Sequence, residues 1–194
     1  MEKVVYKIVK GILHAFCLVT HRVKKVGEDN IPKDGAYIIC ANHRSNWDPV
    51  ILITCTKRKI CFLAKEELFC NKFFIWLAKI FEIFPVKRGK QDIESTKNSL
   101  RILKEGKLLG LFPEGTRNGL AKNGKAKNGA AYLALKTGVP VIPVGIKGKF
   151  KLFSKITLNY GKPIYFNEYK NNTDKEVLEK VSKDIMESII SLTK

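Results

Sequence analysis

The chain of 194 residues is long enough for one domain with a substantial core, and its 45% hydrophobic and 28% charged residues exclude a disordered tail. The 36 lysines and arginines against 18 aspartates and glutamates give a formal net charge of +18, which predicts an anionic partner. Nucleic acid, an acidic membrane face and a phosphorylated substrate all fit this charge, because each of them is anionic. Composition alone does not choose among them.

Five cysteines and three histidines are present, and neither set shows the short spacing of a zinc site or of a disulfide framework. Apolar runs surround several of the cysteines, which is typical of reduced thiols in a core. We therefore expect a cytosolic protein with free thiols and no bound metal.

The N-terminal segment is apolar but interrupted by lysines. Its uncharged stretch, residues 11–20, is far shorter than the roughly 20 residues that span a bilayer. An amphipathic helix fits better, and such a helix either lies in a membrane interface or packs on the domain. Its expected faces are apolar at Val5, Ile8, Val9, Ile12, Phe16 and Val19 and basic at Lys3, Lys7 and Lys10. We expect residues 1–25 to form a membrane-associating segment and residues 26–194 a single folded domain.

Short apolar runs alternate with longer helical patterns through the rest of the chain. The predicted strands cover residues 36–41, 60–64, 84–87, 107–112, 139–146 and 156–160. The predicted helices cover residues 49–56, 67–81, 91–104, 127–136 and 174–192. This alternation predicts an α/β fold, a single domain with a mostly parallel central sheet flanked by helices and preceded by the amphipathic helix. The aromatic segment 68–84 fits both a core helix and a helix that dips into a bilayer.

Polar residues follow three of the predicted strands at the point where each strand ends. His43 follows the first strand, Arg88 the third and Glu114 the fourth. Functional residues of open parallel sheets collect at the carboxyl ends of the strands, so we expect these side chains at one edge of the sheet.

The segment Asn-His-Arg-Ser-Asn-Trp-Asp-Pro, which begins at Asn42, follows an apolar strand and must be a surface loop. Asp48 and Pro49 match the N-cap and the first position of a helix, so one interpretation gives Asp48 only a capping role. The alternative pairs Asp48 with His43. A five-residue separation places two side chains about 140° apart on a helix, so this pairing needs an intervening loop. The carboxylate would then fix the imidazole tautomer and leave the other ring nitrogen as a general base.

Four ordered motifs carry a resemblance to a known family. They are Asn-His-x-Ser-x-x-Asp from Asn42, Phe-Pro-Val-Lys-Arg-Gly from Phe84, Phe-Pro-Glu-Gly-Thr-Arg from Phe112 and Val-Pro-Val-Ile-Pro-Val from Val139. Together they resemble the blocks of the glycerolipid acyltransferases, the group that includes lysophosphatidate acyltransferase. The resemblance covers about residues 36–146 and implies that the folded domain is an acyltransferase domain.

The resemblance implies transfer of a fatty acyl group to the sn-2 hydroxyl of 1-acyl-sn-glycerol 3-phosphate, giving phosphatidate in phospholipid biosynthesis. It implies catalysis by His43 with Asp48. It also implies contacts with the acceptor from Lys65, Arg88, Glu114, Gly115, Thr116 and Arg117. Arginine suits a phosphate because its planar guanidinium donates two parallel hydrogen bonds. A carboxylate repels phosphate, so we expect Glu114 either to hold the guanidinium of Arg117 or to accept a hydrogen bond from a glycerol hydroxyl.

The resemblance implies no cofactor beyond the acyl thioester, acyl-CoA or acyl-ACP, which acts as co-substrate. The expected partners are lysophosphatidate, the thioester, acyl carrier protein if it is the donor, and an anionic membrane surface, with no nucleic acid. We expect a peripheral or monotopic protein on the cytoplasmic face of the cell membrane. One alternative is an acyltransferase of the same family with another lysolipid acceptor. The other is a basic nucleic-acid-binding module, which explains the charge but not the four motifs.

Overall fold

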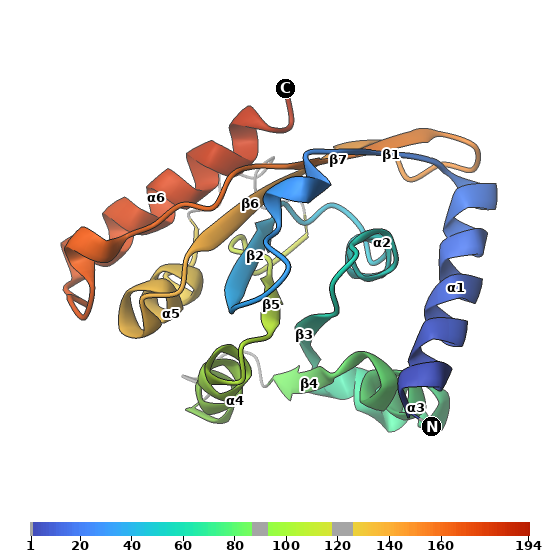
Figure 1. Cartoon of the computed structure of the whole chain (residues 1–194), viewed down its shortest axis with the longest axis horizontal. Helices are drawn as coiled ribbons and strands as arrows, with labels where there is room; N and C mark the ends of the chain where they lie inside the picture. The colour runs from blue at the N-terminus through green and yellow to red at the C-terminus, as the bar shows by residue number, and fades with distance from the viewer. Residues whose placement is uncertain (1, 87–92, 118–125) are drawn as a thin grey trace.

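The computed structural model describes residues 2–86, 93–117 and 126–194. Within these residues, a seven-stranded sheet runs through the middle of the molecule in the order β1-β7-β6-β2-β5-β3-β4 (Figure 1). Its strands are β1 (Arg22–Val26), β2 (Tyr37–Ala41), β3 (Ile60–Lys65), β4 (Ile83–Val86), β5 (Leu108–Leu111), β6 (Val141–Gly148) and β7 (Lys155–Tyr160).

Five neighbouring strands of this sheet, from β6 to β4, are mutually parallel. The central strand β2 pairs with β5 and β6, so that Ile39 lies opposite both Gly110 and Ile142. Strand β7 runs antiparallel to β6, and β1 is parallel to β7. The predicted α/β fold with a mostly parallel sheet is therefore confirmed.

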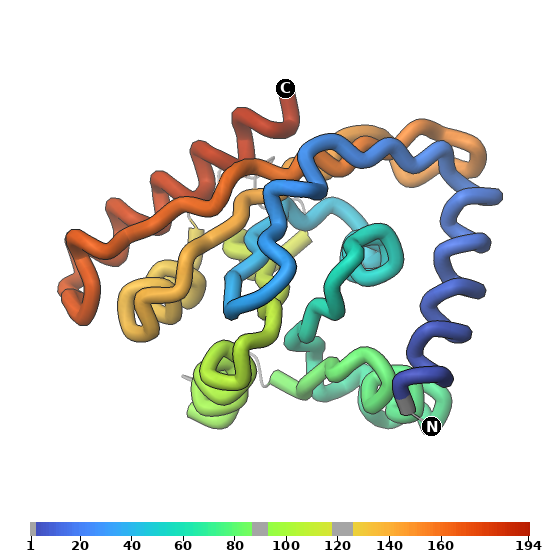
Figure 2. Tube along the Cα trace, in the orientation of Figure 1, coloured from blue at the N-terminus to red at the C-terminus, as the bar shows by residue number. Residues whose placement is uncertain are grey.

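Helices cover both faces of the sheet, as the tube in Figure 2 also shows. One face carries α1 (Glu2–Thr20), α2 (Asp48–Cys55) and α3 (Lys72–Phe81), and the other carries α4 (Ile93–Lys104), α5 (Gly129–Thr137) and α6 (Lys175–Ser191). Alternate strand residues enter two separate cores: Ile39 packs with the first set of helices, and Ile38 and Cys40 pack with the second. Short 3-10 helices are η1 (Glu28–Asn30), η2 (Glu66–Cys70) and η4 (Asn167–Tyr169).

Strand β1 was not predicted, because its sequence Arg-Val-Lys-Lys-Val shows no long apolar run. It forms the edge of the sheet, where Val23 pairs with Ile156. Exposed lysines suit an edge strand because they discourage pairing with another chain. The strand lies across the domain boundary predicted between residues 25 and 26, and that boundary stays a prediction.

The single helix predicted for residues 67–81 was wrong, since the chain forms η2 and then α3. The side chain of Asn71 separates the two elements by accepting hydrogen bonds from the backbone nitrogens of Phe73 at 2.8 Å and Phe74 at 3.3 Å. This N-cap satisfies amides that a continuous helix would have bonded to its preceding turn. Residues 87, 91 and 92, which were also assigned to predicted elements, lie outside the described residues.

Helix α1 packs on the domain through one face and exposes another. The packed face carries Tyr6, Val9, Leu13 and Cys17. Lys10 was predicted on an outer basic face, but it turns inward and its Nζ donates to the carbonyl oxygen of Thr56 at 2.6 Å. The exposed face carries Val4, Ile8, Ile12, Phe16 and Val19. Among the helices of the described residues, none has both the length and the apolar composition needed to cross a bilayer.

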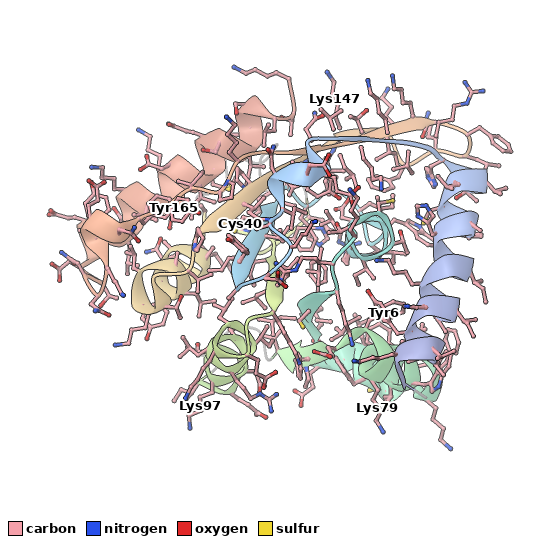
Figure 3. All side chains as sticks on the ribbon, in the orientation of Figure 1. Tyr6, Cys40, Lys79, Lys97, Lys147 and Tyr165 are labelled. Carbon is pink, nitrogen blue, oxygen red and sulfur yellow. The ribbon has the colours of Figure 1, made fainter. Side chains whose placement is uncertain are left out.

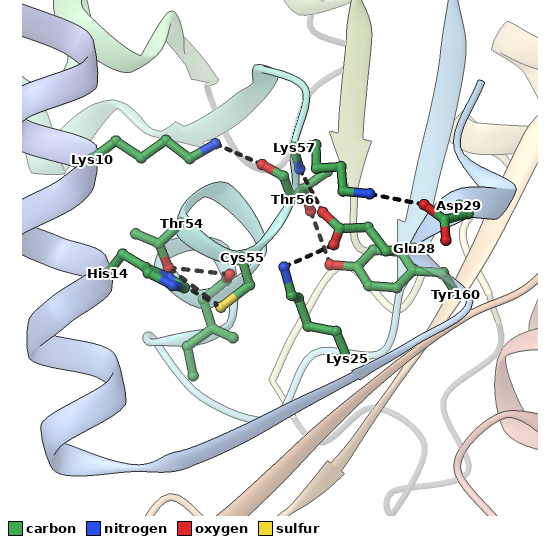
Figure 4. A network of polar contacts seen from close by, with 11 residues as sticks. Lys10, His14, Lys25, Glu28, Asp29, Thr54, Cys55, Thr56, Lys57 and Tyr160 are labelled. Atoms are coloured by element: carbon green, nitrogen blue, oxygen red, sulfur yellow. Dashed lines mark hydrogen bonds and ion pairs between the residues drawn. The ribbon is translucent and has the colours of Figure 1, made fainter. Parts of the chain in front are cut away.

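A polar network joins α1, η1 and the edge strands to the end of α2 (Figure 4). The hydroxyls of Thr56 and Tyr160 lie 2.9 Å apart, next to the bond from Lys10. Glu28 accepts from the backbone nitrogen of Lys57 at 2.7 Å and pairs with Lys25 at 2.7 Å. The N-terminal segment is therefore bonded to the domain at several points.

A second network lies at the amino ends of the parallel strands. The carboxylate of Glu82 accepts from Lys59 and Lys107, each at 2.8 Å, and from the thiol of Cys61 at 3.3 Å. Burial opposes ionisation of Glu82, but these hydrogen bonds outweigh it and lower its pKa from 4.5 to about 2. The lysines beside Glu82 thus balance a partly buried charge.

Candidate active site

Asn42 fixes the point where the chain leaves β2. Its buried amide donates from Nδ2 to the carbonyl oxygen of Ile146 at 3.0 Å and accepts at Oδ1 from the backbone nitrogen of Ile146 at 2.7 Å. These bonds continue the pairing of β2 with β6 beyond Ala41. They direct the next loop over the carboxyl end of the sheet.

The loop folds back so that His43 and Asp48 meet. Nδ1 of His43 lies 2.8 Å from Oδ2 of Asp48, and this oxygen also accepts from the backbone nitrogens of Arg44 at 2.6 Å and Ser45 at 2.7 Å. Asp48 is fully buried, and its Oδ1 has no hydrogen-bond partner among the described residues. The His43 side chain is 15% exposed, and its pairing through Nδ1 leaves Nε2 for another partner.

Asp48 does not cap α2. The N-cap is Trp47, and Asp48 and Pro49 are the first residues of the helix. The capping interpretation was wrong because the carboxylate turns back toward the loop and bonds residues that precede the helix. The helix therefore serves as a rigid base from which Asp48 reaches the imidazole.

Glu114 connects the segment after β5 to the histidine. Its buried carboxylate accepts at Oε1 from the backbone nitrogen of His43 at 2.9 Å. This bond holds the main chain of the histidine and not its ring. Neither role considered from the sequence, a bond to Arg117 or to a glycerol hydroxyl, anticipates this contact.

An aromatic stack, formed by Phe62, Phe112 and His43, supports the imidazole from the core side. The ring centroids of His43 and Phe112 lie 4.2 Å apart with an interplanar angle of 19°, and those of Phe112 and Phe62 lie 5.8 Å apart at 21°. Gly110 makes room for the stack, because a Cβ there would lie 2.3 Å from the ring of Phe62. Sequence reasoning missed the stack, although a glycine inside a strand signals a close approach.

The motif Phe-Pro-Glu-Gly-Thr-Arg forms a tight turn after β5. The backbone nitrogen of Gly115 donates to the carbonyl oxygen of Phe112 at 2.9 Å, so this N–H is used within the turn. Gly115 has φ of 65°, a left-handed conformation that favours glycine. The side chain of Lys127 lies across it, and a Cβ on Gly115 would lie 2.5 Å from Cε of Lys127.

Of the remaining predicted contacts, Thr116 and Arg117 are exposed in the same turn. Within the described part of the chain, the guanidinium of Arg117 has no hydrogen-bond or ion-pair partner. Lys65 is the last residue of β3, half-buried at the same edge of the sheet. Arg88 lies outside the described residues. No group of three or more His, Cys, Asp or Glu side chains among the described residues is placed to hold a metal ion.

The arrangement has the parts of a general base, with cationic side chains at the same end of the strands. The imidazole is bonded to a buried carboxylate, held through its main chain and stacked on a phenyl ring. Such a base accepts the proton of a hydroxyl that attacks a carbonyl group. Cationic side chains at the same edge suit a phosphate on the molecule that carries the hydroxyl.

The sequence is similar to known acyltransferases. A family model described as Acyltransferase matches residues 22–147, which include all four motifs. The 1-acyl-sn-glycerol-3-phosphate acyltransferase of Streptococcus pneumoniae is 34% identical over an alignment of 157 positions that covers 77% of this chain and 58% of that protein. The enzyme of the same name from Bacillus subtilis is 29% identical over an alignment of 194 positions that covers 96% of each chain.

The fold is similar to a solved structure as well. The crystal structure of the 1-acyl-sn-glycerophosphate (LPA) acyltransferase PlsC from Thermotoga maritima matches with a TM-score of 0.71 at 26% sequence identity. The match covers 98% of this chain and 80% of that one. The chain thus spans most of the Thermotoga and Bacillus proteins but little more than half of the streptococcal one.

Proposed function

The chain belongs to the acyltransferase family, and from this premise we propose that it transfers a fatty acyl group from a thioester to the sn-2 hydroxyl of 1-acyl-sn-glycerol 3-phosphate, giving phosphatidate. The family resemblance read from the four motifs is confirmed. The nucleic-acid-binding alternative loses its support, because the family accounts for the motifs and an anionic lipid accounts for the charge.

The observation that carries the proposal is the way His43 is held. Asp48 bonds its ring, Glu114 bonds its main chain, and Phe112 stacks against its face. Three contacts of different kinds leave the imidazole little freedom to turn. A base fixed in this way needs no rearrangement when the acceptor hydroxyl binds. General base catalysis of this kind raises the reaction rate by roughly 10²–10⁴-fold.

The reaction requires no covalent enzyme intermediate. Nε2 of His43 removes the proton of the acceptor hydroxyl, and the oxygen attacks the thioester carbonyl carbon. The tetrahedral intermediate collapses with cleavage of the carbon–sulfur bond, and the thiolate leaves and takes the proton from the imidazolium. Asp48 stabilises the imidazolium while it exists. The products are the ester and the free thiol.

The acceptor phosphate is proposed to bind near the turn that contains Arg117. The exposed guanidinium has no partner in the described part of the chain, so it is available for a bidentate bond to phosphate. Thr116 offers a hydroxyl in the same turn, and Lys65 and Arg88 complete the proposed set of cations. The contact of Glu114 with His43 supports a role for this carboxylate in holding the base, beside the phosphate and not on it.

Acyl-CoA and acyl-ACP are the proposed donors, with no other cofactor. The proposed location is the cytoplasmic face of the cell membrane, with peripheral or monotopic attachment. The exposed apolar face of α1 and the net charge of +18 support binding to an anionic bilayer. Because the acceptor is itself a lipid, attachment keeps enzyme and substrate at one surface.

The proposal is tested by product analysis with a panel of lysolipids and both thioesters. Lysophosphatidate should give phosphatidate, and lysolipids whose phosphate carries a head group should react poorly. Equal turnover of lysophosphatidylcholine would show that the acceptor is a different lysolipid of the same family. Absence of acyl transfer to every lysolipid would refute the proposed function.

A further inference from the structure

The tip of the hairpin between β6 and β7, residues 149–154, presents two large apolar side chains to solvent. Leu152 is 66% exposed and Phe153 is 64% exposed. Phe153 has φ of 59°, in the left-handed region where glycine and asparagine are favoured over bulky residues. Folding alone would favour a glycine here, so an exposed phenyl ring in this conformation points to another use.

The backbone holds this tip in place. The nitrogen of Phe153 donates to the carbonyl oxygen of Thr20 at 2.7 Å, and the nitrogen of Arg22 donates to the carbonyl oxygen of Ser154 at 2.9 Å. Phe150 packs on the core and its ring meets that of His21 edge-on at 6.0 Å. The two apolar side chains are therefore presented from a fixed support at the end of α1 (Figure 1).

The tip follows the carboxyl end of β6, and the candidate site lies at the carboxyl end of the neighbouring strand β2. Val19, beside Thr20 at the end of α1, is 70% exposed. One turn earlier in α1, Phe16 stacks on Trp47 of the catalytic loop, with ring centroids 5.7 Å apart. We call these exposed side chains the apolar rim: Phe16, Val19, Trp47, Leu152 and Phe153. It extends from the hairpin to the loop that joins His43 to Asp48.

The charges around the rim identify its partner. Residues 149–155 contain three lysines and no carboxylate. Arg22 and Lys24 of β1 are exposed beside them. Apolar side chains surrounded by lysines match a bilayer with anionic head groups, because the chains enter the interface and the lysines meet phosphates. A nucleic acid would use the lysines but leave Leu152 and Val19 exposed.

We propose that the apolar rim inserts into the interfacial layer of an anionic bilayer, with the β6–β7 tip as an anchor additional to the outer face of α1. This orientation turns the loop of His43 toward the membrane. The inference rests on the proposed function, since a lysolipid acceptor would then reach the site directly from the bilayer.

The test uses the full-length double variant Leu152→Ser/Phe153→Gly. Its binding to vesicles of phosphatidylglycerol and phosphatidylcholine should require about tenfold more lipid than that of the unmodified protein, because two apolar side chains no longer leave water. Its melting temperature should not fall, since glycine relieves the left-handed residue. Weaker binding without loss of stability distinguishes a docking role from a structural one.

Tyr165→Ala is the matched control, an aromatic side chain that is 60% exposed. It follows the bridge between Val141 and Ile164, at the opposite end of β6, and Figure 3 places it away from α1. This variant should bind vesicles like the unmodified protein. If the double variant loses stability, Phe153→Asn keeps the left-handed conformation and removes the ring, and it should still weaken binding.

Vesicle binding is measured without turnover, so it tests the membrane insertion of the apolar rim independently of the acyl-transfer reaction. Unchanged vesicle binding of both Phe153 variants would overturn the proposal, as would equal loss in the Tyr165→Ala control. An unmodified protein that binds vesicles but acylates no lysolipid would refute the proposed function and leave the rim standing. With a short-chain, water-soluble lysophosphatidate, the double variant should turn over normally, because the two side chains act only at the bilayer. A loss of turnover with this soluble acceptor would overturn the proposal.

Discussion

Each end of the parallel strands holds a carboxylate, one partly buried and one fully buried, and the two carboxylates are hydrogen-bonded by different groups. At the amino ends, Glu82 is bonded by two lysine ammonium groups and a thiol. At the carboxyl ends, Asp48 is bonded by two main-chain amides and the ring of His43. The first set balances the carboxylate with cations, whereas the second fixes the position of the carboxylate beside the imidazole.

This difference predicts that one carboxylate serves stability and the other serves catalysis. A carboxylate paired with cations gains little from any further positive charge nearby. A carboxylate held by neutral amides favours the positive charge that appears on an imidazole when it accepts a proton. We therefore expect substitutions at the two ends to affect different measurements, activity at one and stability at the other.

The largest expected effect is that of His43→Ala on turnover. Loss of the base should lower kcat by roughly 10²–10⁴-fold. The variant should still fold and bind vesicles, because the backbone nitrogens of Arg44 and Ser45 continue to hold Asp48. His14→Ala, which removes a partly buried histidine of α1, should retain turnover. Near-normal kcat in the His43 variant would exclude it as the base.

The next effect concerns the acceptor. Arg117→Ala should raise KM for lysophosphatidate about 10–100-fold, which corresponds to loss of one charge-assisted hydrogen-bonded pair, with a smaller change in kcat. Steady-state kinetics at saturating thioester provides the measurement. Arg101→Ala on α4 is the control, and KM should not change. A rise confined to KM for the thioester would place Arg117 at the donor and not at the acceptor.

A third variant tests the aromatic stack without touching a polar group. Gly110→Ala pushes a methyl group against the ring of Phe62 and, through Phe112, against the imidazole. We expect kcat to fall about tenfold with KM nearly unchanged, because small misplacements of a catalytic group are costly. The compensating substitution Phe62→Leu in the same chain should restore part of kcat. Equal losses in kcat with and without that substitution would count against the stack.

The smallest effect is expected at the amino ends. Glu82→Gln should lower the free energy of unfolding by about 1 kcal/mol, since the partly exposed lysines that lose a carboxylate are screened by water. Its kcat should equal that of the unmodified protein. A change in kcat comparable with that of Gly110→Ala would contradict the expectation that the amino ends of the strands affect stability and not activity.

The effect of Glu82→Gln on the free energy of unfolding should decrease as the pH falls. The pKa of Glu82 is lowered from 4.5 to about 2 in the folded chain, so its stabilisation is complete above pH 4.5 and is lost as the pH falls toward 2. The difference in unfolding free energy between the two proteins, from denaturant titrations, should therefore shrink over that interval. A constant difference down to about pH 2 would contradict the role assigned to Glu82.

The sequence predicted the elements well where the signal was local. Apolar runs located six strands, and the rule that function collects at their carboxyl ends brought His43 and Glu114 to one edge. Strand β1 was missed because its pairing with β7 joins residues more than a hundred positions apart and needs no apolar pattern at an edge. The break at Asn71 was missed because the apolar pattern continues across it.

The contacts of the site were less predictable than its members. His43 and Asp48 are only five positions apart, so the polar sequence between them predicted a loop that brings the two side chains together. The bond of Glu114 to the main chain of His43 and the meeting of Phe62 with Gly110 depend on the registers of β2, β5 and β3. Register between strands is set by the whole sheet, and a single sequence does not encode it locally.

We expect the aromatic stack to give apolar residues an influence on reaction rate. Phe62 is buried and stacks on Phe112, which in turn stacks on the imidazole, so we expect its volume to affect where the imidazole rests. A search for faster or slower forms of this protein should therefore include interior positions on the face of the sheet that carries Phe62. Substitutions there would tune turnover by shape alone and leave every charge in place.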